Sequence, residues 1–142
     1  MKVVYEESIE FKAREIIKES NSGIIFREDL SELGSYRQVS RVLNKLIASK
    51  ELAKIGQGVY AKAYESEYID YPLLKGGFGV VAREALDRLG IEWEMSSAEA
   101  AYNSGETQQV PVNHMVRLKT RCRRQLSYAG LQVKFEGDIN AR

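Results

Sequence analysis

Basic and amide side chains recur at helical spacing between residues 35 and 51, a pattern that suggests contact with a nucleic acid. Arginine can pair with guanine through two hydrogen bonds, and asparagine or glutamine can pair with adenine in the same way. Hydroxyl groups commonly donate to phosphates. A solvated helix face is the alternative interpretation. The candidate DNA contacts on this stretch are Ser35, Tyr36, Arg37, Gln38, Ser40, Arg41, Asn44 and Lys45.

One amphipathic helix is expected to position these side chains. Apolar residues stand at positions 39, 42, 43, 46 and 47, which is the spacing of a single buried helix face. Ser35 precedes the first turn and Gln38 follows three residues later, so the two form a capping-box pattern. Gly34 supplies a flexible turn before the helix. Because no acidic residue follows before Glu51, the exposed face is left to cations and amides.

A short hairpin is predicted directly after this helix. The runs 52–55 and 59–62 are strand-like, and the glycine-rich segment between them favours a turn. A capped basic helix followed by a two-stranded hairpin is typical of a winged helix-turn-helix, whose second helix enters the DNA major groove. Lys54, Gln57 and Lys62 are then candidate contacts from the wing to the DNA backbone or minor groove.

The segments upstream of the central helix complete the same layout. Residues 6–20 have the pattern of a first helix, 24–26 form a short strand or a buried connector, and 27–33 form a short second helix. The order is therefore helix, short strand, helix, turn, helix and hairpin. We predict a winged helix-turn-helix DNA-binding domain over residues 1–62.

The second half of the chain is predicted to form a smaller unit. Residues 63–79, rich in tyrosine and glutamate, indicate an extended connector, and residues 80–142 a small α+β domain. Its expected elements are helices over 80–89 and 96–103, strands over 91–95 and 114–119, and a hairpin formed by 124–128 and 131–135. The fold class is therefore α+β: an N-terminal winged helix-turn-helix followed by a small α+β module ending in a β-hairpin.

Charge is unevenly distributed along the chain, although the net charge is only +1. Residues 35–62 carry 6 basic and 1 acidic side chains, and residues 106–142 carry 7 and 3, whereas the other two segments are acidic. The second basic segment could extend the DNA footprint, meet an acidic partner, or keep an exposed sheet edge soluble. Its candidate contacts are Arg117, Lys119, Arg121, Arg123 and Arg124.

Catalytic chemistry finds little support in the sequence. His114 is the only histidine and Cys122 the only cysteine, whereas a metal site usually needs three or four such ligands. The glycine-rich segment 75–79 lacks the spacing and the Lys-Ser/Thr end of a phosphate-binding loop. We therefore expect no enzyme activity, no catalytic residue, no metal and no cofactor. No apolar run approaches a membrane span, and the single cysteine agrees with a reducing cytoplasm.

Nearly the whole chain resembles the AbiEi-like antitoxins, which are transcriptional regulators of type IV toxin–antitoxin systems. In the first half the resemblance rests on residues 38–43 and on Gly58-Val59-Tyr60. In the second half it rests on residues 97–101, on residues 107–111 and on the hairpin from Arg123 to Gly130. The resemblance implies double-stranded DNA of the protein's own promoter as a partner, repression of its own operon, and a role against a nucleotidyltransferase-like toxin. The alternative is a winged-helix adaptor that binds proteins without reading DNA.

Overall fold

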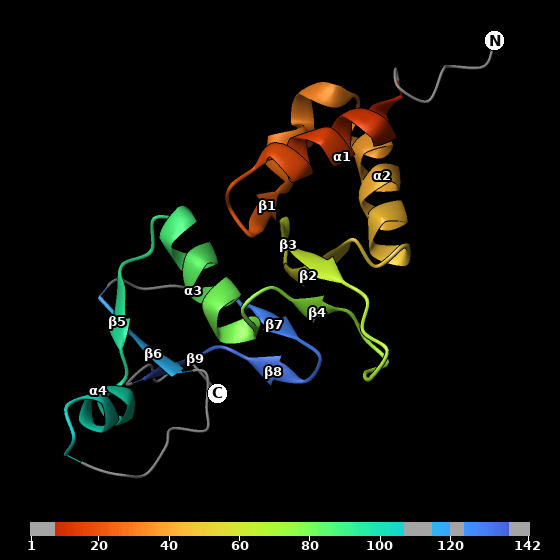
Figure 1. Cartoon of the computed structure of the whole chain (residues 1–142). Helices are drawn as coiled ribbons and strands as arrows, with labels where there is room; N and C mark the ends of the chain where they lie inside the picture. Colours follow the sequence, from red (N-terminus) through yellow and green to blue (C-terminus); the bar gives the residue numbers. More distant parts are fainter. Residues whose placement is uncertain (1–7, 107–114, 120–123, 137–142) are drawn as a thin grey trace.

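The computed structural model of the 142-residue chain describes residues 8–106, 115–119 and 124–136, which form an α+β fold (Figure 1). In chain order the elements are α1 (Ile9–Glu19), β1 (Ile24–Phe26), the 3₁₀ helix η2 (Arg27–Leu33), α2 (Tyr36–Ala48), β2 (Leu52–Gly56), β3 (Val59–Tyr64), β4 (Leu73–Leu74), α3 (Phe78–Arg88), β5 (Trp93–Met95), α4 (Ser97–Asn103), β6 (Met115–Leu118), β7 (Ser127–Tyr128), β8 (Leu131–Gln132) and β9 (Lys134–Glu136). The short second helix expected over 27–33 is thus a 3₁₀ helix.

Helix α2 begins as its sequence predicts. The Ser35 hydroxyl accepts a hydrogen bond from the Gln38 backbone N–H at 3.2 Å, and the Gln38 side-chain oxygen accepts one from the Ser35 N–H at 2.8 Å. This reciprocal pair satisfies two N–H groups that a helix start would otherwise leave unpaired. Val39, Leu43 and Leu46 are buried on the inner face, so the predicted capping box and the predicted apolar face are both confirmed.

The first sheet has the order β1-β3-β2, with β4 pairing antiparallel to the end of β3. Its side chains alternate between two apolar layers, as the period of two in a β-strand requires. Leu52 and Tyr60 pack with the helices α1, η2 and α2, whereas Ala53, Ile55 and Ala61 pack on the opposite face. The hairpin is therefore covered on both faces rather than exposed on one (Figure 1).

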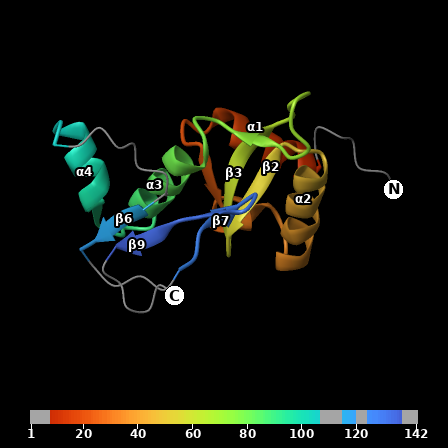
Figure 2. The same cartoon turned by 90° about the horizontal axis from the view of Figure 1, so that it is seen from below.

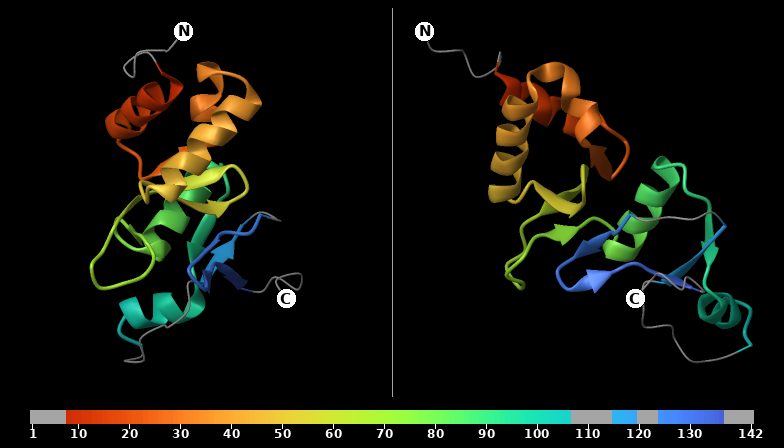
Figure 3. Two further views of the ribbon diagram at one scale, coloured as in Figure 1. Left: turned by 90° about the vertical axis from the view of Figure 1, so that its right-hand side faces the viewer. Right: turned by 180° about the vertical axis from the view of Figure 1, so that it is seen from behind.

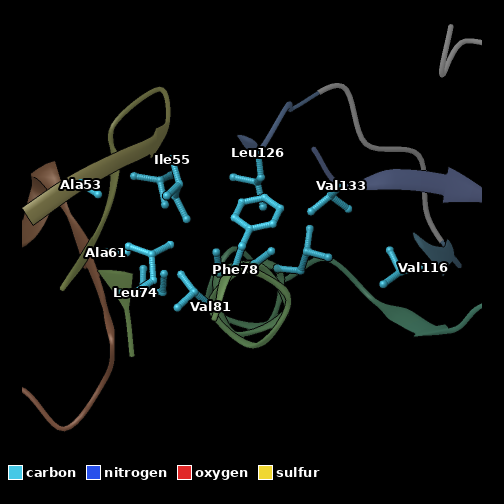
Figure 4. Close-up of a cluster of buried hydrophobic side chains, with 14 residues drawn as sticks. Ala53, Ile55, Ala61, Leu74, Phe78, Val81, Val116, Leu126 and Val133 are labelled. Carbon is cyan, nitrogen blue, oxygen red and sulfur yellow. The ribbon is translucent and has the colours of Figure 1, made fainter. Parts of the chain in front are cut away.

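The second apolar layer joins the two halves of the chain. Residues of the hairpin share one buried cluster with Leu74, with the α3 side chains Phe78 and Val81, and with Leu126 and Val133 near the C-terminus (Figure 4). The sequence predicts a domain boundary over residues 63–79. In the structure the apolar core crosses that segment, which contains the last two residues of β3 and all of β4.

Polar contacts from α3 also reach the first half. The Glu84 carboxylate accepts hydrogen bonds from the Ser22 hydroxyl at 2.6 Å and from the Gly23 N–H at 3.0 Å. Arg88 donates to the Ile24 carbonyl at 2.6 Å, and its guanidinium lies over the Phe26 ring. Because these contacts meet the turn before β1 and β1 itself, α3 fixes the edge of the first sheet.

The remaining strands form two smaller sheets. β6 pairs antiparallel with β5 and parallel with β9, so β6 is the central strand of the sheet β5-β6-β9. The predicted hairpin over 124–135 is shorter than expected: only β7 and β8 pair with each other, and residues 134–136 leave to join β6. Ala129 and Gly130 both have positive φ, at 51° and 84°, as a two-residue hairpin turn requires. Helices α4 and α2 lie at opposite ends of the molecule (Figures 1 and 2).

We predict that Glu51→Gln lowers stability by about 0.5–1 kcal/mol near neutral pH, an estimate reduced for solvent screening because the Glu51 side chain is 43% exposed. Arg14 donates to both Glu51 oxygens, at 3.0 and 2.8 Å, and this contact lowers the pKa of Glu51 below its ordinary value of 4.5, although burial opposes the shift. Because the pKa of Glu51 is lowered on folding, the ionised carboxylate stabilises the protein at pH values above its ordinary pKa. This stabilisation is lost as the pH falls through the folded-state pKa.

Urea unfolding of both proteins as a function of pH measures this effect. Wild type and Glu51→Gln should differ at neutral pH and converge in acid, whereas Glu65→Gln, in an exposed pair with Lys50, should match wild type throughout. A difference between wild type and Glu51→Gln that persists below the folded-state pKa would assign the loss to packing instead.

Candidate nucleic-acid interface

The outward face of α2 presents most of the predicted base contacts to solvent. Arg37, Arg41, Asn44 and Lys45 are exposed, and the helix contains no acidic residue. Arg41 lies in the middle of this face, between the capped first turn and the C-terminal end. The face therefore offers two guanidinium groups and an amide of the types that can pair with base edges.

Several predicted contacts on α2 are engaged within the protein. The Ser35 hydroxyl and the Gln38 side-chain oxygen form the helix cap, which leaves the Gln38 amide nitrogen to donate elsewhere. The Lys45 ammonium pairs with Glu10 of α1 at 2.9 Å, although its side chain is 66% exposed. The cationic character of the helix is therefore strongest toward its N-terminal half, at Arg37 and Arg41.

A groove of about 1160 Å³ opens beside the N-terminal end of α2. It is lined by η2 and α2 on one side, by the β2–β3 hairpin, and by the segment that leads into β7. Its lining residues include Arg27, Tyr36, Lys54, Gln57, Tyr60, Arg124, Gln125 and Ser127. No carboxylate lies among the described residues that line it, so the charge of the groove comes from Arg27, Lys54 and Arg124.

A glycine in β2 brings the C-terminal segment to this groove. A Cβ at Gly56 would lie 2.9 Å from Leu126 Cδ2 and 3.1 Å from the Gln125 carbonyl, so any other residue here would require these neighbours to shift. The segment 124–126 can therefore lie against β2, and Arg124 donates to the Gln57 carbonyl in the hairpin turn at 3.3 Å. Figure 3 shows the hairpin, in yellow, with the gold α2 on one side and the blue C-terminal strands on the other.

Arg27 is a cation of the groove that the sequence pattern did not reveal. Its backbone N–H donates to the Gly58 carbonyl in the hairpin turn at 3.0 Å. Its guanidinium lies 3.8 Å from the centre of the Tyr36 ring and donates to the Tyr36 carbonyl and the Ser40 hydroxyl. In the sequence Arg27 opens a short acidic stretch, so only its spatial neighbours place it with the candidate contacts.

Tyr60 forms part of the groove wall between these cations. It pairs with Lys54 across the hairpin and is 6% exposed. Burial raises the pKa of the Tyr60 phenol above its ordinary value of 10.0, and the nearby charge of Arg27 opposes this shift. The phenol is therefore protonated at neutral pH.

Several predicted contacts lie away from the groove. Lys62 stands at the far end of β3 from the hairpin turn, where its ammonium donates to the Ser20 carbonyl at 2.5 Å. Arg117 on β6 contacts Glu94 at 3.4 Å and the Ser97 hydroxyl at 2.8 Å. Lys119 is exposed at the end of the same segment. Arg121 and Arg123 lie outside the described residues, so the structure joins only Arg124 of the second basic segment to the first.

For metal, catalytic or phosphate chemistry the sequence offers His114, Cys122 and the glycine-rich segment 75–79. No group of three histidine, cysteine, aspartate or glutamate side chains that could hold a metal occurs there. His114 and Cys122 both lie outside those residues. The glycine-rich segment 75–79 runs into the first turn of α3, where Gly77 with φ of 89° precedes the helix. No helix of the described segments is long and apolar enough to cross a membrane.

The fold and the surface define the molecule as an α+β protein with an exposed cationic helix beside a groove whose described lining carries no carboxylate. Neither a scan against protein-family models nor searches of curated proteins and of solved structures found a significant match to this chain.

Proposed function

We propose that this protein is a sequence-specific regulator that binds double-stranded DNA through a winged helix-turn-helix. The observation that supports the proposal most directly is the exposed face of α2, which carries Arg37, Arg41 and Asn44 and no carboxylate. In this reading η2 and α2 are the helix-turn-helix and α2 lies in the major groove. The β2–β3 hairpin is the wing.

The groove beside α2 then accommodates the sugar–phosphate backbone that separates the major groove from the neighbouring minor groove. Arg27, Lys54 and Arg124 would neutralise phosphates there, while α2 reads base edges. Contacts to phosphates position a protein on DNA without carrying sequence information. The proposal therefore divides the surface into a base-reading helix and a phosphate-binding groove.

The resemblance to AbiEi-like antitoxins suggests a biological role for this DNA binding. In this reading the bound DNA is the promoter of the protein's own operon, binding represses transcription, and the protein counters a nucleotidyltransferase-like toxin in the cytoplasm. The exposed cations Arg117 and Lys119 lie apart from the groove, which makes them candidate contacts for that partner or for flanking DNA.

We expect affinity for a duplex from the protein's own upstream region to fall steeply with salt. Neutralising a phosphate releases counterions, so log K falls against log salt with a slope of about −0.9 per phosphate. If the groove cations Arg27, Lys54 and Arg124 each neutralise one phosphate, the slope is about −2.7. Fluorescence anisotropy across a salt series, with an unrelated duplex as competitor, measures both the slope and the sequence preference.

Lys75→Ala is a matched control for this measurement. Lys75 is exposed but stands in the loop before α3, outside the groove lining. Its loss should leave the slope unchanged. Absence of binding to the upstream duplex even at low salt would refute the proposed function.

A protein-interaction adaptor is the second candidate, and one surface favours it. The last residue of β3, Tyr64, is exposed, and the loop from β3 to β4 exposes Tyr68 and Tyr71 together with Glu65 and Glu67. Exposed tyrosines gathered in one place are typical of protein contact surfaces. If Arg41→Ala abolishes duplex binding and replacement of these tyrosines does not, the DNA-binding hypothesis is favoured. If replacement of the tyrosines abolishes binding and Arg41→Ala does not, the adaptor hypothesis is favoured.

A further inference from the structure

Tyr36 is an exposed aromatic ring in the first turn of the proposed recognition helix. It is 75% exposed, more than any other large hydrophobic residue outside the β3–β4 loop among those described. Burial of its ring therefore does not account for an aromatic residue at this position. The exposed face of the ring is accessible to any ligand that lies against the first turn of α2.

The ring is held in place although it is exposed. The Arg27 guanidinium covers it at 3.8 Å from the ring centre and donates to the carbonyl of Tyr36 and to the hydroxyl of Ser40, one turn further along α2. Arg27 is itself anchored, since its N–H donates to the Gly58 carbonyl at 3.0 Å. The hairpin turn, η2 and the first turn of α2 therefore fix the direction of Tyr36 together, so little ordering remains when a ligand binds.

We propose that Tyr36, held by Arg27, is a specificity-determining contact that recognises the 5-methyl group of thymine in the major groove. The inference rests on the proposed function, because it requires α2 to enter that groove. N-terminal residues of the second helix in a helix-turn-helix contact base edges. Among the four bases only thymine presents a methyl group there, and apolar side chains recognise it by contact.

The Tyr36 hydroxyl allows a competing role, donation to a phosphate. The two roles make opposite demands on the side chain. A methyl contact uses the ring and survives Tyr36→Phe, whereas a phosphate contact uses the hydroxyl and does not. The role of Arg27 is positional in the first case, so Arg27→Lys should keep the charge and lose the planar stack that directs the ring.

Replacing thymine by uracil tests the proposal without altering the protein. The tightest-binding duplex is first selected from a randomised pool with the full-length protein, and each thymine in it is then replaced singly by uracil, which removes one methyl group. We expect one or two positions at which wild-type affinity falls about fourfold, as the burial of one methyl group predicts. The other replacements should have no effect.

Variants then assign the effect to the ring. Tyr36→Ala should bind the thymine and uracil duplexes equally, Tyr36→Phe should keep the fourfold difference, and Arg27→Lys should reduce it while leaving the salt slope within error of wild type. Tyr102→Ala, which removes an exposed tyrosine from α4 at the other end of the molecule, is the matched control and should retain the difference.

The outcomes distinguish failure of the thymine contact from failure of the DNA-binding function. If wild type binds a selected sequence and no uracil replacement weakens binding, the thymine contact is wrong and the DNA-binding function stands. A uracil effect that persists in Tyr36→Ala also overturns the assignment. If no duplex is selected or retained at low salt, the DNA-binding function fails and the thymine contact fails with it. Circular dichroism of each variant identifies loss of fold, and the wild-type uracil series remains decisive in that event.

Discussion

Phe78→Ala is expected to destabilise the whole protein by about 3–5 kcal/mol, because truncating a buried phenylalanine removes its transfer free energy and leaves a cavity. Phe78 is 5% exposed and lies at the start of α3, in the cluster that joins Ile55 and Ala61 of the hairpin to Leu126 and Val133 (Figure 4). The lost contacts belong to both halves of the chain, so both halves should unfold together.

Two local probes measure whether they do. Trp93, the only tryptophan, reports on the second half through its contacts with Arg83 and Asp87. Hydrogen exchange of α2 amides reports on the first half. We expect coincident transitions by both probes, which is the behaviour of one cooperative unit. Val80→Ala is the control on the same helix, because Val80 is 58% exposed. It should change the free energy of unfolding by no more than about 0.5 kcal/mol by either probe. Loss of Trp93 structure with undisturbed α2 protection would instead support an independent domain over residues 1–62.

Local patterns predicted α2 and the hairpin because short-range physics determines them. The Ser35–Gln38 cap, the apolar spacing along α2 and the glycine turn at Gly58 each involve residues within a few positions of one another. The sequence could not show in the same way that β6 and β9 pair in parallel, since residues 115–117 and 134–136 meet only through the packing of intervening segments.

The shared core had a sequence signal that the winged-helix interpretation overlooked. Leu52-Ala53 and Val59-Tyr60-Ala61 are apolar at consecutive positions, so both faces of these strands carry side chains that avoid water. A strand apolar on both faces is one covered on both faces. Gly56 inside a strand was a second signal, since it marks a close approach of another backbone segment. Together these two features indicate that something packs behind the hairpin.

The candidate site was predictable only in part, for a similar reason. Arg37 and Arg41 were found from helical periodicity, which places them on one face. Arg27 and Arg124 join Lys54 only in the folded chain, through the contacts with Gly58 and Gln57. Lys62 was predicted as a DNA contact but is engaged elsewhere. Its ammonium donates to the Ser20 carbonyl at the C-terminal end of α1, which alternation along the strand cannot reveal.

Arg41→Ala and Lys54→Ala should weaken DNA binding in different ways. Arg41 lies in the middle of the exposed face of α2, so its loss should cost about 1–3 kcal/mol at the preferred sequence and little elsewhere, as expected for a lost bidentate contact to a base. Lys54 lines the groove at the hairpin. Its loss should weaken all sequences alike and reduce the salt slope by about 0.9, as expected for one lost phosphate contact.

Competition binding with the selected duplex and with single-base variants of it, repeated across a salt series, separates the two effects. Lys50→Ala supplies the control, because Lys50 follows α2 but pairs with Glu65 at 3.1 Å and lies outside the groove lining. The control should match wild type in both preference and slope. If Arg41→Ala and Lys54→Ala flatten the base preference equally, the division between a base-reading helix and a phosphate-binding groove is wrong. In that event the hairpin must itself reach base edges, and the direction in which α2 crosses the duplex would have to be reassigned.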